Sequence, residues 1–174
     1  PASVLEAGIN FLKPIVLNKN PLENEVIWSE MYRKTLDFAR RGILVASMSA
    51  IDIALWDLKG KILNLPVSLL LGGVYRKKIK PYATGLYFSD RNNPSKDFDE
   101  EAANYISRGF KAIKMKVGLG VDLDFKHVKR MREVIGDDIQ LMVDSNHAYS
   151  LSEAIALAKK IEPFNISWFE EPIS

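Results

Sequence analysis

The chain has 174 residues, of which 47% are hydrophobic and 26% are charged, a composition typical of globular proteins. Its 24 basic and 22 acidic residues leave a net charge of only +2, which argues against binding to nucleic acid or to a membrane surface. No run approaches the ~20 apolar residues of a membrane span. The absence of cysteine excludes disulfides and thiolate metal sites and fits a reducing compartment, so we expect a cytoplasmic protein.

The first 75 residues are predicted to be mainly helical. One helix is expected over 20–39, because Asn20 followed by Pro is typical of an N-cap and a first helical turn. A second helix is expected over 43–64. It is apolar or small on nearly every side, which predicts burial around most of its circumference. A short helical turn over 66–73 would end at a pair of glycines.

After residue 75, short strand-like runs alternate with helical patterns. Strands are expected at 79–84, 112–117, 139–145 and 166–170, and helices at about 97–108, 122–135 and 151–161. Ser150 with Glu153 forms a capping box for the last helix, and a polar loop follows the first strand at 91–95. Strand ends recur roughly every thirty residues, which is typical of βαβ units and predicts an α/β fold with a parallel sheet.

Charged side chains stand at the predicted carboxyl ends of the last three strands. Because alternate residues of a strand share a face, Lys114 and Lys116 lie on one face of theirs. Asp144 ends the next strand and Glu170 ends the last one. Two lysines and two carboxylates would therefore meet at one rim, and that rim carries the active site in parallel α/β folds.

These residue types indicate metal-assisted proton removal. Carboxylates suit a hard cation such as Mg²⁺. Two adjacent lysines repel each other, which would lower the pKa of each and allow one to act as a general base. Each feature alone also has a structural explanation: a solvated rim lysine, an aspartate that caps the next helix, or a solvated acidic pair. Their combination at successive strand ends favours a site.

The two histidines are expected to play no part in this site. His127 lies in the middle of a predicted helix with lysines on either side, which predicts a surface residue. His147 follows Asn146 in a loop and is expected to form hydrogen bonds there rather than to bind a metal.

The motifs KMKVG, MVDSNHAY and WFEEP resemble the successive strand motifs of the enolase superfamily, in its mandelate racemase and muconate lactonizing enzyme branch. Upstream, SAIDIALWDLKGK and LPVSLLLGG resemble the end of that family's capping domain. The resemblance covers nearly the whole chain. It implies that residues 1–75 are the helical portion of an α+β capping domain, and that 76–174 are the first four strands of a TIM-type (β/α) barrel. Family members carry a further metal-binding carboxylate and a second acid/base on later strands. We therefore expect the middle half of a longer enzyme, inactive and poorly soluble by itself.

Transferred residue by residue, the resemblance assigns roles to the charged cluster. Lys116 would be the base that removes the α-proton of a carboxylate substrate, as lysine does in this superfamily. Lys114 would tune that base and lie near the substrate carboxylate. Asp144 and Glu170 would bind Mg²⁺, which would neutralise the enediolate formed after proton loss.

Two further residues complete the implied site. Asn146 would lie beside the metal and the substrate, whereas Glu171 would support the metal ligands from behind, with its side chain pointing away from the rim. The segments YATGLYF, VDSNHAY and WFEEPIS most resemble sugar-acid dehydratases, which implies a hydro-lyase that forms a 2-keto-3-deoxy sugar acid.

Other functions stay open. A racemase, epimerase or cycloisomerase of the same branch would use the same residues. A Schiff-base aldolase would form an imine on Lys114 or Lys116, and an inactive fragment would only inherit the fold. We expect a small carboxylate as the substrate and a homo-oligomer when the chain is full length.

Overall fold

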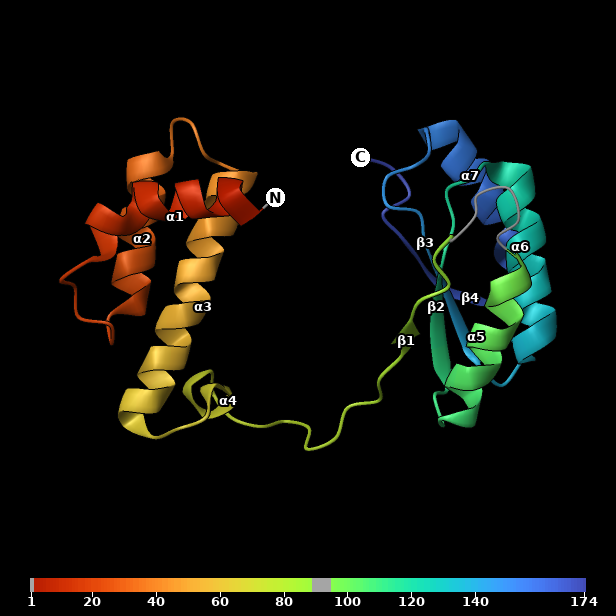
Figure 1. Ribbon diagram of the computed structural model, residues 1–174, viewed down its shortest axis with the longest axis horizontal. Helices are drawn as coiled ribbons and strands as arrows, with labels where there is room; N and C mark the ends of the chain where they lie inside the picture. Colours follow the sequence, from red (N-terminus) through yellow and green to blue (C-terminus); the bar gives the residue numbers. More distant parts are fainter. Residues whose placement is uncertain (1, 89–94) are drawn as a thin grey trace. The chain divides into compact units, whose positions relative to one another are not determined.

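A computed structural model describes residues 2–88 and 95–174 of the chain, which forms two compact units, Pro1–Lys77 and Lys78–Ser174 (Figure 1). Of the polar loop predicted over 91–95, only the last residue falls within the described part, at the start of a helix. Among the helices of these two described ranges, none combines the length and the apolar character needed to span a bilayer.

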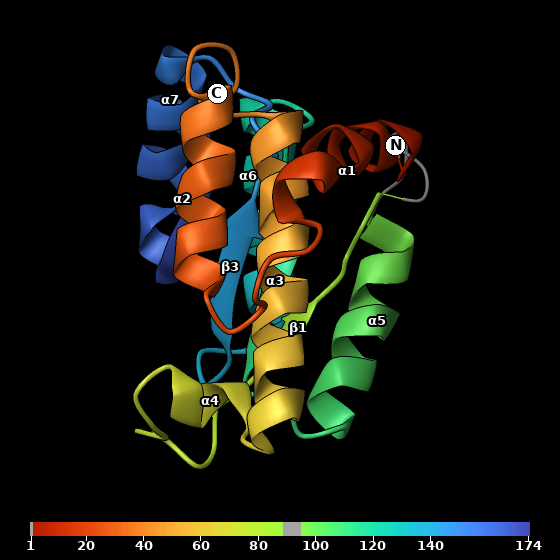
Figure 2. The same cartoon turned by 90° about the vertical axis from the view of Figure 1, so that its left-hand side faces the viewer.

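The first unit is built from helices α1 (Ala2–Val16), α2 (Asn24–Thr35), α3 (Ile43–Leu63) and α4 (Val67–Leu70). Helix α1 lies across α3 (Figures 1 and 2), and Gly8 permits the close contact, because a Cβ there would lie 2.2 Å from Ser47 Oγ. The Ser47 hydroxyl also donates a hydrogen bond of 3.2 Å to the Leu5 carbonyl. The core between the first three helices consists of apolar side chains: Leu12, Ile15, Ile27, Met31, Met48 and Leu55.

Two details of this unit differ from the prediction. Helix α2 begins at Asn24, because Asn20 closes a separate turn by accepting a hydrogen bond of 3.1 Å from the amide two residues later. Helix α3 is buried along one stripe rather than around most of its circumference. Met48 is fully buried in that stripe, whereas Ile53 and Ile62 are 66% and 51% exposed. The apolar composition of α3 therefore predicts more burial than the helix has within this unit.

The second unit confirms the predicted α/β fold. Its strands β1 (Ala83–Thr84), β2 (Ala112–Lys116), β3 (Gln140–Asp144) and β4 (Ile166–Glu170) form a parallel sheet in the order β1-β2-β3-β4. Its helices are α5 (Ser95–Ser107), α6 (Val121–Ile135) and α7 (Leu151–Ile161), followed by a 3₁₀ turn, Glu162–Phe164. Strand β1 is shorter than predicted, in keeping with Pro81, which has no amide hydrogen to donate to a sheet.

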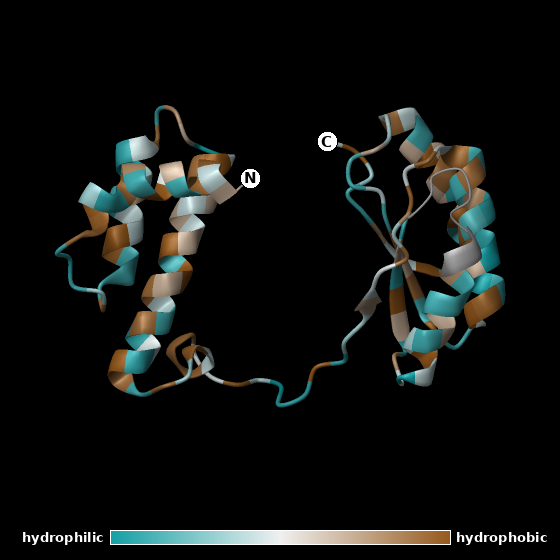
Figure 3. Cartoon of the chain, viewed as in Figure 1, coloured by the Kyte–Doolittle hydropathy of each residue, from teal (hydrophilic) through white to brown (hydrophobic). Residues whose placement is uncertain are grey.

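The three helices of this unit lie on one face of the sheet (Figure 1), and the strands that face them are hydrophobic (Figure 3). Ile113 and Met115 of β2, with Leu141 and Val143 of β3, are fully buried in the core that the sheet forms with these helices. The alternation predicted for β2 is therefore confirmed, because its lysines occupy the positions between these core residues. The opposite face of the sheet is left to carry polar groups.

The chain enters α7 through the predicted capping box. Ser150 Oγ accepts a hydrogen bond from the Glu153 amide at 3.4 Å, and the Glu153 carboxylate accepts one from the Ser150 amide at 2.9 Å. Both bonds satisfy amides that a helix start would otherwise leave without a partner. They fix the chain direction soon after the carboxyl end of β3.

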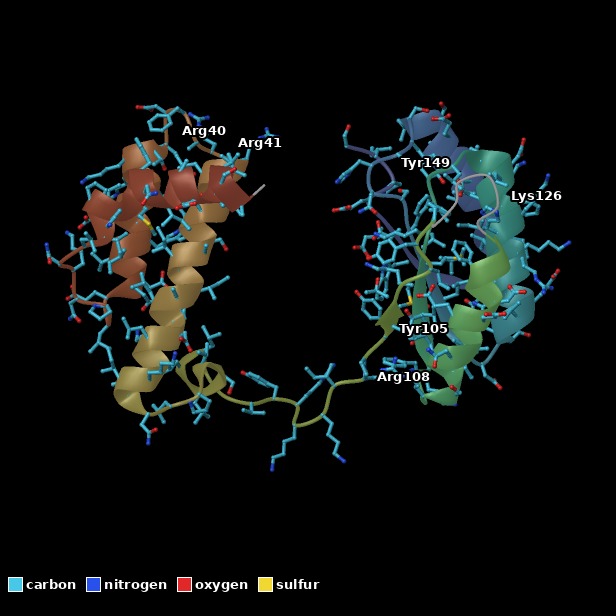
Figure 4. All side chains as sticks on the ribbon, viewed as in Figure 1. Arg40, Arg41, Tyr105, Arg108, Lys126 and Tyr149 are labelled. Atoms are coloured by element: carbon cyan, nitrogen blue, oxygen red, sulfur yellow. The ribbon has the colours of Figure 1, made fainter. Side chains whose placement is uncertain are left out.

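His127 is the clearest departure from the prediction for this unit. Its side chain was expected at the surface, but His127 is only 7% exposed, with ring centroids 6.1 Å from Phe98 and 6.4 Å from Phe88. Helix α6 directs this position towards the aromatic side chains while the neighbouring Lys126 points away from the sheet (Figure 4). Burial lowers the pKa of His127, because the charged imidazolium loses hydration there.

The free energy of unfolding is therefore expected to fall as the pH decreases below about 6.5. The unfolded chain protonates His127 with its ordinary pKa, whereas the folded chain resists protonation until a lower pH. The stabilising contribution of neutral His127 is thus fully present above about pH 6.5, and it is lost as the pH falls from the unfolded pKa to the folded pKa. Urea denaturation at several pH values should show a weaker pH dependence in His127→Gln than in the wild type. His147→Gln is the control, since that side chain is 52% exposed. An unchanged slope in His127→Gln would contradict this account.

Candidate active site

The register of the parallel sheet places three charged residues side by side at its carboxyl end. Lys116 of β2 pairs with Asp144 of β3, which in turn pairs with Glu170 of β4. Lys114 precedes Lys116 by two residues on the same strand and so shares its face. The structure therefore brings together the two lysines and two carboxylates that the sequence places at strand ends.

These four side chains form one network of ion pairs. Lys116 Nζ donates to Asp144 Oδ2 at 2.6 Å and to Asn146 Oδ1 at 2.6 Å. Lys114 Nζ donates to Glu170 Oε2 at 2.7 Å and lies 3.4 Å from Asp144 Oδ2. The side chains of Lys114 and Asp144 are only 9% and 3% exposed, so water screens these contacts weakly.

The ion pairs shift the pKa values towards the charged forms. Burial is the largest single influence on Lys114 and would lower its pKa, but the hydrogen bond to Glu170 and the nearby negative charges together outweigh burial and raise this pKa. Burial is likewise the largest single influence on Asp144 and opposes its ionisation, yet the hydrogen bonds from Lys116 and from the Asn146 amide, with the charges of both lysines, together lower the pKa of this carboxyl. The bond from Lys114 lowers the pKa of Glu170. The expected lowering of the lysine pKa by mutual repulsion is thus wrong for Lys114, because the carboxylates 2.7 and 3.4 Å from its Nζ favour the charged form.

Asn146 links this network to the loop that follows β4. Its amide nitrogen Nδ2 donates to Glu171 Oε2 at 3.1 Å while its Oδ1 faces Lys116, and its backbone amide donates to Asp144 Oδ1 at 3.1 Å. Asn146 and Glu171 have left-handed φ angles of 46° and 44°. The strand alternation therefore ends at β4, and the Glu171 side chain turns towards Asn146 instead of away from the rim. As predicted, His147 forms a loop hydrogen bond, in which Nδ1 lies 3.0 Å from a backbone carbonyl beyond β4.

Two tyrosines on either side of β1 lie over the lysines, one just before the strand and one in the loop after it. Lys114 Nζ lies 5.6 Å from the ring centroid of Tyr82, and Lys116 Nζ lies 5.3 Å from that of Tyr87. Tyr87, Lys116 and Asn146 also line a pocket of about 320 Å³ at this end of the sheet. A pocket of about 420 Å³ lies beside α7 and β4 but is lined by none of the four charged residues. The smaller pocket is therefore the one that adjoins the candidate chemistry.

Sequence analysis missed both tyrosines, for different reasons. Thr84 pairs with Lys114 in the sheet, and Tyr82 stands two residues before Thr84. Strand alternation could therefore have placed Tyr82 on the lysine face. Tyr87 lies beyond the end of β1, where alternation no longer applies.

The two carboxylates fit a magnesium ion. Both already reach a single cation, since Lys114 Nζ lies 2.7 Å from Glu170 Oε2 and 3.4 Å from Asp144 Oδ2. Within residues 2–88 and 95–174, no group of three or more His, Cys, Asp or Glu residues surrounds one point. Two carboxylates are still a suitable donor set, because Mg²⁺ commonly binds proteins through one or two carboxylates and keeps several waters.

Comparison with known proteins identifies both units. Residues 3–72 match the mandelate racemase / muconate lactonizing enzyme N-terminal domain, and residues 97–174 match the enolase C-terminal domain-like family. Arabinonate dehydratase of Saccharolobus solfataricus is 42% identical over 163 residues, which are 93% of this chain and 43% of that enzyme. The chain spans less than half the length of the curated relatives that it matches.

Solved structures extend this comparison. The 3,6-anhydro-D-galactonate cycloisomerase from Zobellia galactanivorans superposes with a TM-score of 0.91 and 56% identity, over 100% of this chain and 48% of that one. A racemase from Streptomyces coelicolor A3(2) with bound magnesium gives a TM-score of 0.84 and 36% identity, over 94% and 45% of the two chains. The four parallel strands thus match part of a (β/α) barrel. The chain belongs to the mandelate racemase and muconate lactonizing enzyme branch of the enolase superfamily.

Proposed function

We propose that the complete polypeptide dehydrates a sugar acid, beginning with removal of the proton on the carbon beside the carboxylate. The observation that carries this proposal is the row formed by Lys116, Asp144 and Glu170 at the carboxyl end of adjacent strands. A base and two metal-binding carboxylates are the groups that such a reaction needs. Similarity to arabinonate dehydratase supports the choice of dehydration.

Asp144 and Glu170 would hold the magnesium ion in this proposal. A bound Mg²⁺ would neutralise negative charge that develops on the substrate carboxylate as the α-proton leaves. The structure of the Streptomyces coelicolor racemase with bound magnesium supports this choice of metal. Lys114, which contacts both carboxylates here, is then the cation that lies beside the substrate carboxylate.

Lys116 accepts the α-proton at Nζ in this proposal. Asp144 Oδ2 and Asn146 Oδ1, each 2.6 Å from Nζ, fix the direction of the side chain. Glu171 accepts from the Asn146 amide nitrogen and so keeps the Asn146 oxygen turned towards Lys116. A general acid would then protonate the β-hydroxyl, which leaves as water, and the resulting enol would tautomerise to a 2-keto-3-deoxy sugar acid.

A second candidate function is cycloisomerisation of a sugar-derived carboxylate. The observation that favours it is the 56% identity with the 3,6-anhydro-D-galactonate cycloisomerase structure. The same row of Lys116, Asp144 and Glu170 would serve this reaction, because it also starts at the carbon beside a carboxylate. The two candidates differ in whether water is lost.

Product analysis tests the proposal and separates the candidates. The complete polypeptide would be incubated with Mg²⁺ and a panel of aldonates and anhydro-aldonates, and the products followed by mass spectrometry and NMR. Dehydration predicts a product 18 Da lighter with a 2-keto group, and cycloisomerisation predicts one of unchanged mass. Chelation of the metal should stop the reaction. Turnover that survives chelation, with trapping of substrate on a lysine by borohydride, would contradict the proposal and indicate an aldolase.

A further inference from the structure

Asp124, in the first turns of α6, is a fully buried carboxylate next to the candidate site. Its Oδ2 accepts three hydrogen bonds, from the Gly118 amide at 3.1 Å, the Leu119 amide at 2.9 Å and the Tyr149 hydroxyl at 2.5 Å. Burial of a carboxylate is costly unless strong partners replace its hydration. Hydrogen bonds to an ionised acceptor are roughly twice as strong as neutral ones. These three hydrogen bonds therefore fix the positions of the Asp124 side chain and of its three partners.

These bonds join the two loops that carry the reactive end of the site. Gly118 and Leu119 follow Lys116 in the loop after β2, and Tyr149 follows Asn146 in the loop after β3. Figure 4 shows Tyr149 at the carboxyl end of the strands and Arg108 towards the opposite end. Asp124 thus connects the loop that follows Lys116 in the chain with the loop that contains Asn146, the hydrogen-bond partner of Lys116.

Close packing between the loops supports the same conclusion. Gly118 has a φ of 122°, and a Cβ at this position would lie 2.9 Å from the Cβ of Ala148. The loops after β2 and β3 therefore touch at Gly118, with Asp124 beneath them. Burial and the bond to Asp124 raise the pKa of Tyr149 far above its usual range, so its hydroxyl remains a donor. The loops have no freedom to separate without breaking these bonds.

A second carboxylate–tyrosine pair holds the loop after the neighbouring strand β1. Glu101 of α5 accepts from the Leu86 amide at 3.1 Å and from the Tyr105 hydroxyl at 2.5 Å. The Tyr105 bond to Glu101 raises the pKa of Tyr105 to about 12. Leu86 lies in the loop after β1 and directly precedes Tyr87, whose ring covers Lys116. Two successive rim loops are therefore each held by an acid from the following helix, whereas only the Asp124 pair also joins a second loop, through Tyr149.

Arg132, near the carboxyl end of α6, is a second buried charged residue that can be compared with Asp124. Arg132 is 8% exposed, and its guanidinium donates to the carbonyls of Gly136 at 2.8 Å and Ile139 at 2.7 Å. Those carbonyls precede β3, at the end of the sheet away from the charged network. Asp124 and Arg132 are therefore two buried charges of one helix that tie loops at opposite ends of the strands.

We propose that Asp124 is a positioning residue for Lys116: it fixes the loops after β2 and β3 so that Lys116 Nζ stays against Asp144 and Asn146. The role rests on the proposed function, since positioning matters for rate only if Lys116 transfers the proton. Asp124 itself touches neither the reacting atoms nor the proposed metal ligands.

The test compares Asp124→Asn, Tyr149→Phe and Arg132→Gln in the complete polypeptide. Asp124→Asn should lower kcat by about 100-fold, because small displacements of a reacting group cost about that much. KM should stay within about threefold, as expected for a change felt mainly in the transition state. Tyr149→Phe keeps the carboxylate and should lower kcat by about tenfold. Arg132→Gln should lower the unfolding midpoint and leave kcat within about twofold, because its loops lie at the far end of the sheet.

A second readout does not depend on turnover. Hydrogen exchange should accelerate at the Gly118 and Leu119 amides in Asp124→Asn, and reductive methylation of Lys116 should become faster. These changes support the inference even if the wild type turns over no sugar acid, a result that would refute only the proposed function. Unchanged exchange and methylation in Asp124→Asn would overturn the inference. Equal losses of kcat in Asp124→Asn and Arg132→Gln would also overturn the inference, because they would show that Asp124 contributes only to the stability of the fold. If Asp124→Asn fails to fold, Tyr149→Phe gives the same readouts.

Discussion

Replacement of Lys116 by alanine is expected to lower kcat by about 10³-fold or more in the complete polypeptide, since a positioned general base contributes typically 10²–10⁴-fold. Lys116 Nζ is held 2.6 Å from Asp144 Oδ2 and 2.6 Å from Asn146 Oδ1, and in its neutral amine form it would accept the substrate proton there. Lys114, the other lysine of the network, stands two residues earlier on β2 and donates to Glu170 instead. The measurement is the steady-state rate with saturating Mg²⁺ and the best substrate of the panel.

Lys111→Ala is the matched control for this variant. Lys111 immediately precedes β2 at its amino end and is exposed, so its loss removes the same kind of side chain far from the rim. It should change kcat by less than about twofold, as surface substitutions usually do. Equal activity in Lys116→Ala and Lys111→Ala would show that Lys116 is not the base.

Removal of either proposed metal ligand is expected to abolish tight Mg²⁺ binding. Asp144→Asn and Glu170→Gln each replace an anionic oxygen donor with a neutral amide of similar shape. The loss should exceed the 10–100-fold that is typical when only a supporting partner of a ligand is removed. Titration calorimetry with Mg²⁺, or Mn²⁺ binding followed by electron paramagnetic resonance, measures the affinity without any substrate.

Asp138→Asn provides the comparison for charge alone. Asp138 is an exposed carboxylate just before β3, at the opposite end of the strand from Asp144. It should bind Mg²⁺ as the wild type does, because a distant exposed charge is screened. Affinity that survives in both Asp144→Asn and Glu170→Gln would place the metal elsewhere and remove the chemical basis of the site.

Much of the charged cluster followed from the sequence, because strand alternation and parallel pairing are local and regular. The positions of Lys114 and Lys116 needed only the two-residue period of β2. Their meeting with Asp144 and Glu170 followed from the rule that parallel strands end at one rim. The structure shows these contacts directly.

Features that depend on long-range packing did not follow from the sequence. His127 looked exposed between lysines, and only the aromatic side chains of Phe88 and Phe98 explain its burial. The pKa of Lys114 rises because Glu170, 56 residues away in sequence, accepts its hydrogen bond and places a negative charge beside it. In the sequence, Asp124 is simply an acidic residue in the first turn of a helix, and nothing in its sequence position indicates the hydrogen bond from Tyr149.

The central claim is that Lys116, with the carboxylates of Asp144 and Glu170, removes a proton from the carbon beside a carboxylate. The most direct measurement follows the label of a sugar acid deuterated at that carbon, in the complete polypeptide with Mg²⁺. We predict that the label leaves this carbon in every turnover of the wild type and that Lys116→Ala retains it there. A wild-type product that keeps the label on the same carbon, or loss of the label at the wild-type rate in Lys116→Ala, would contradict the claim.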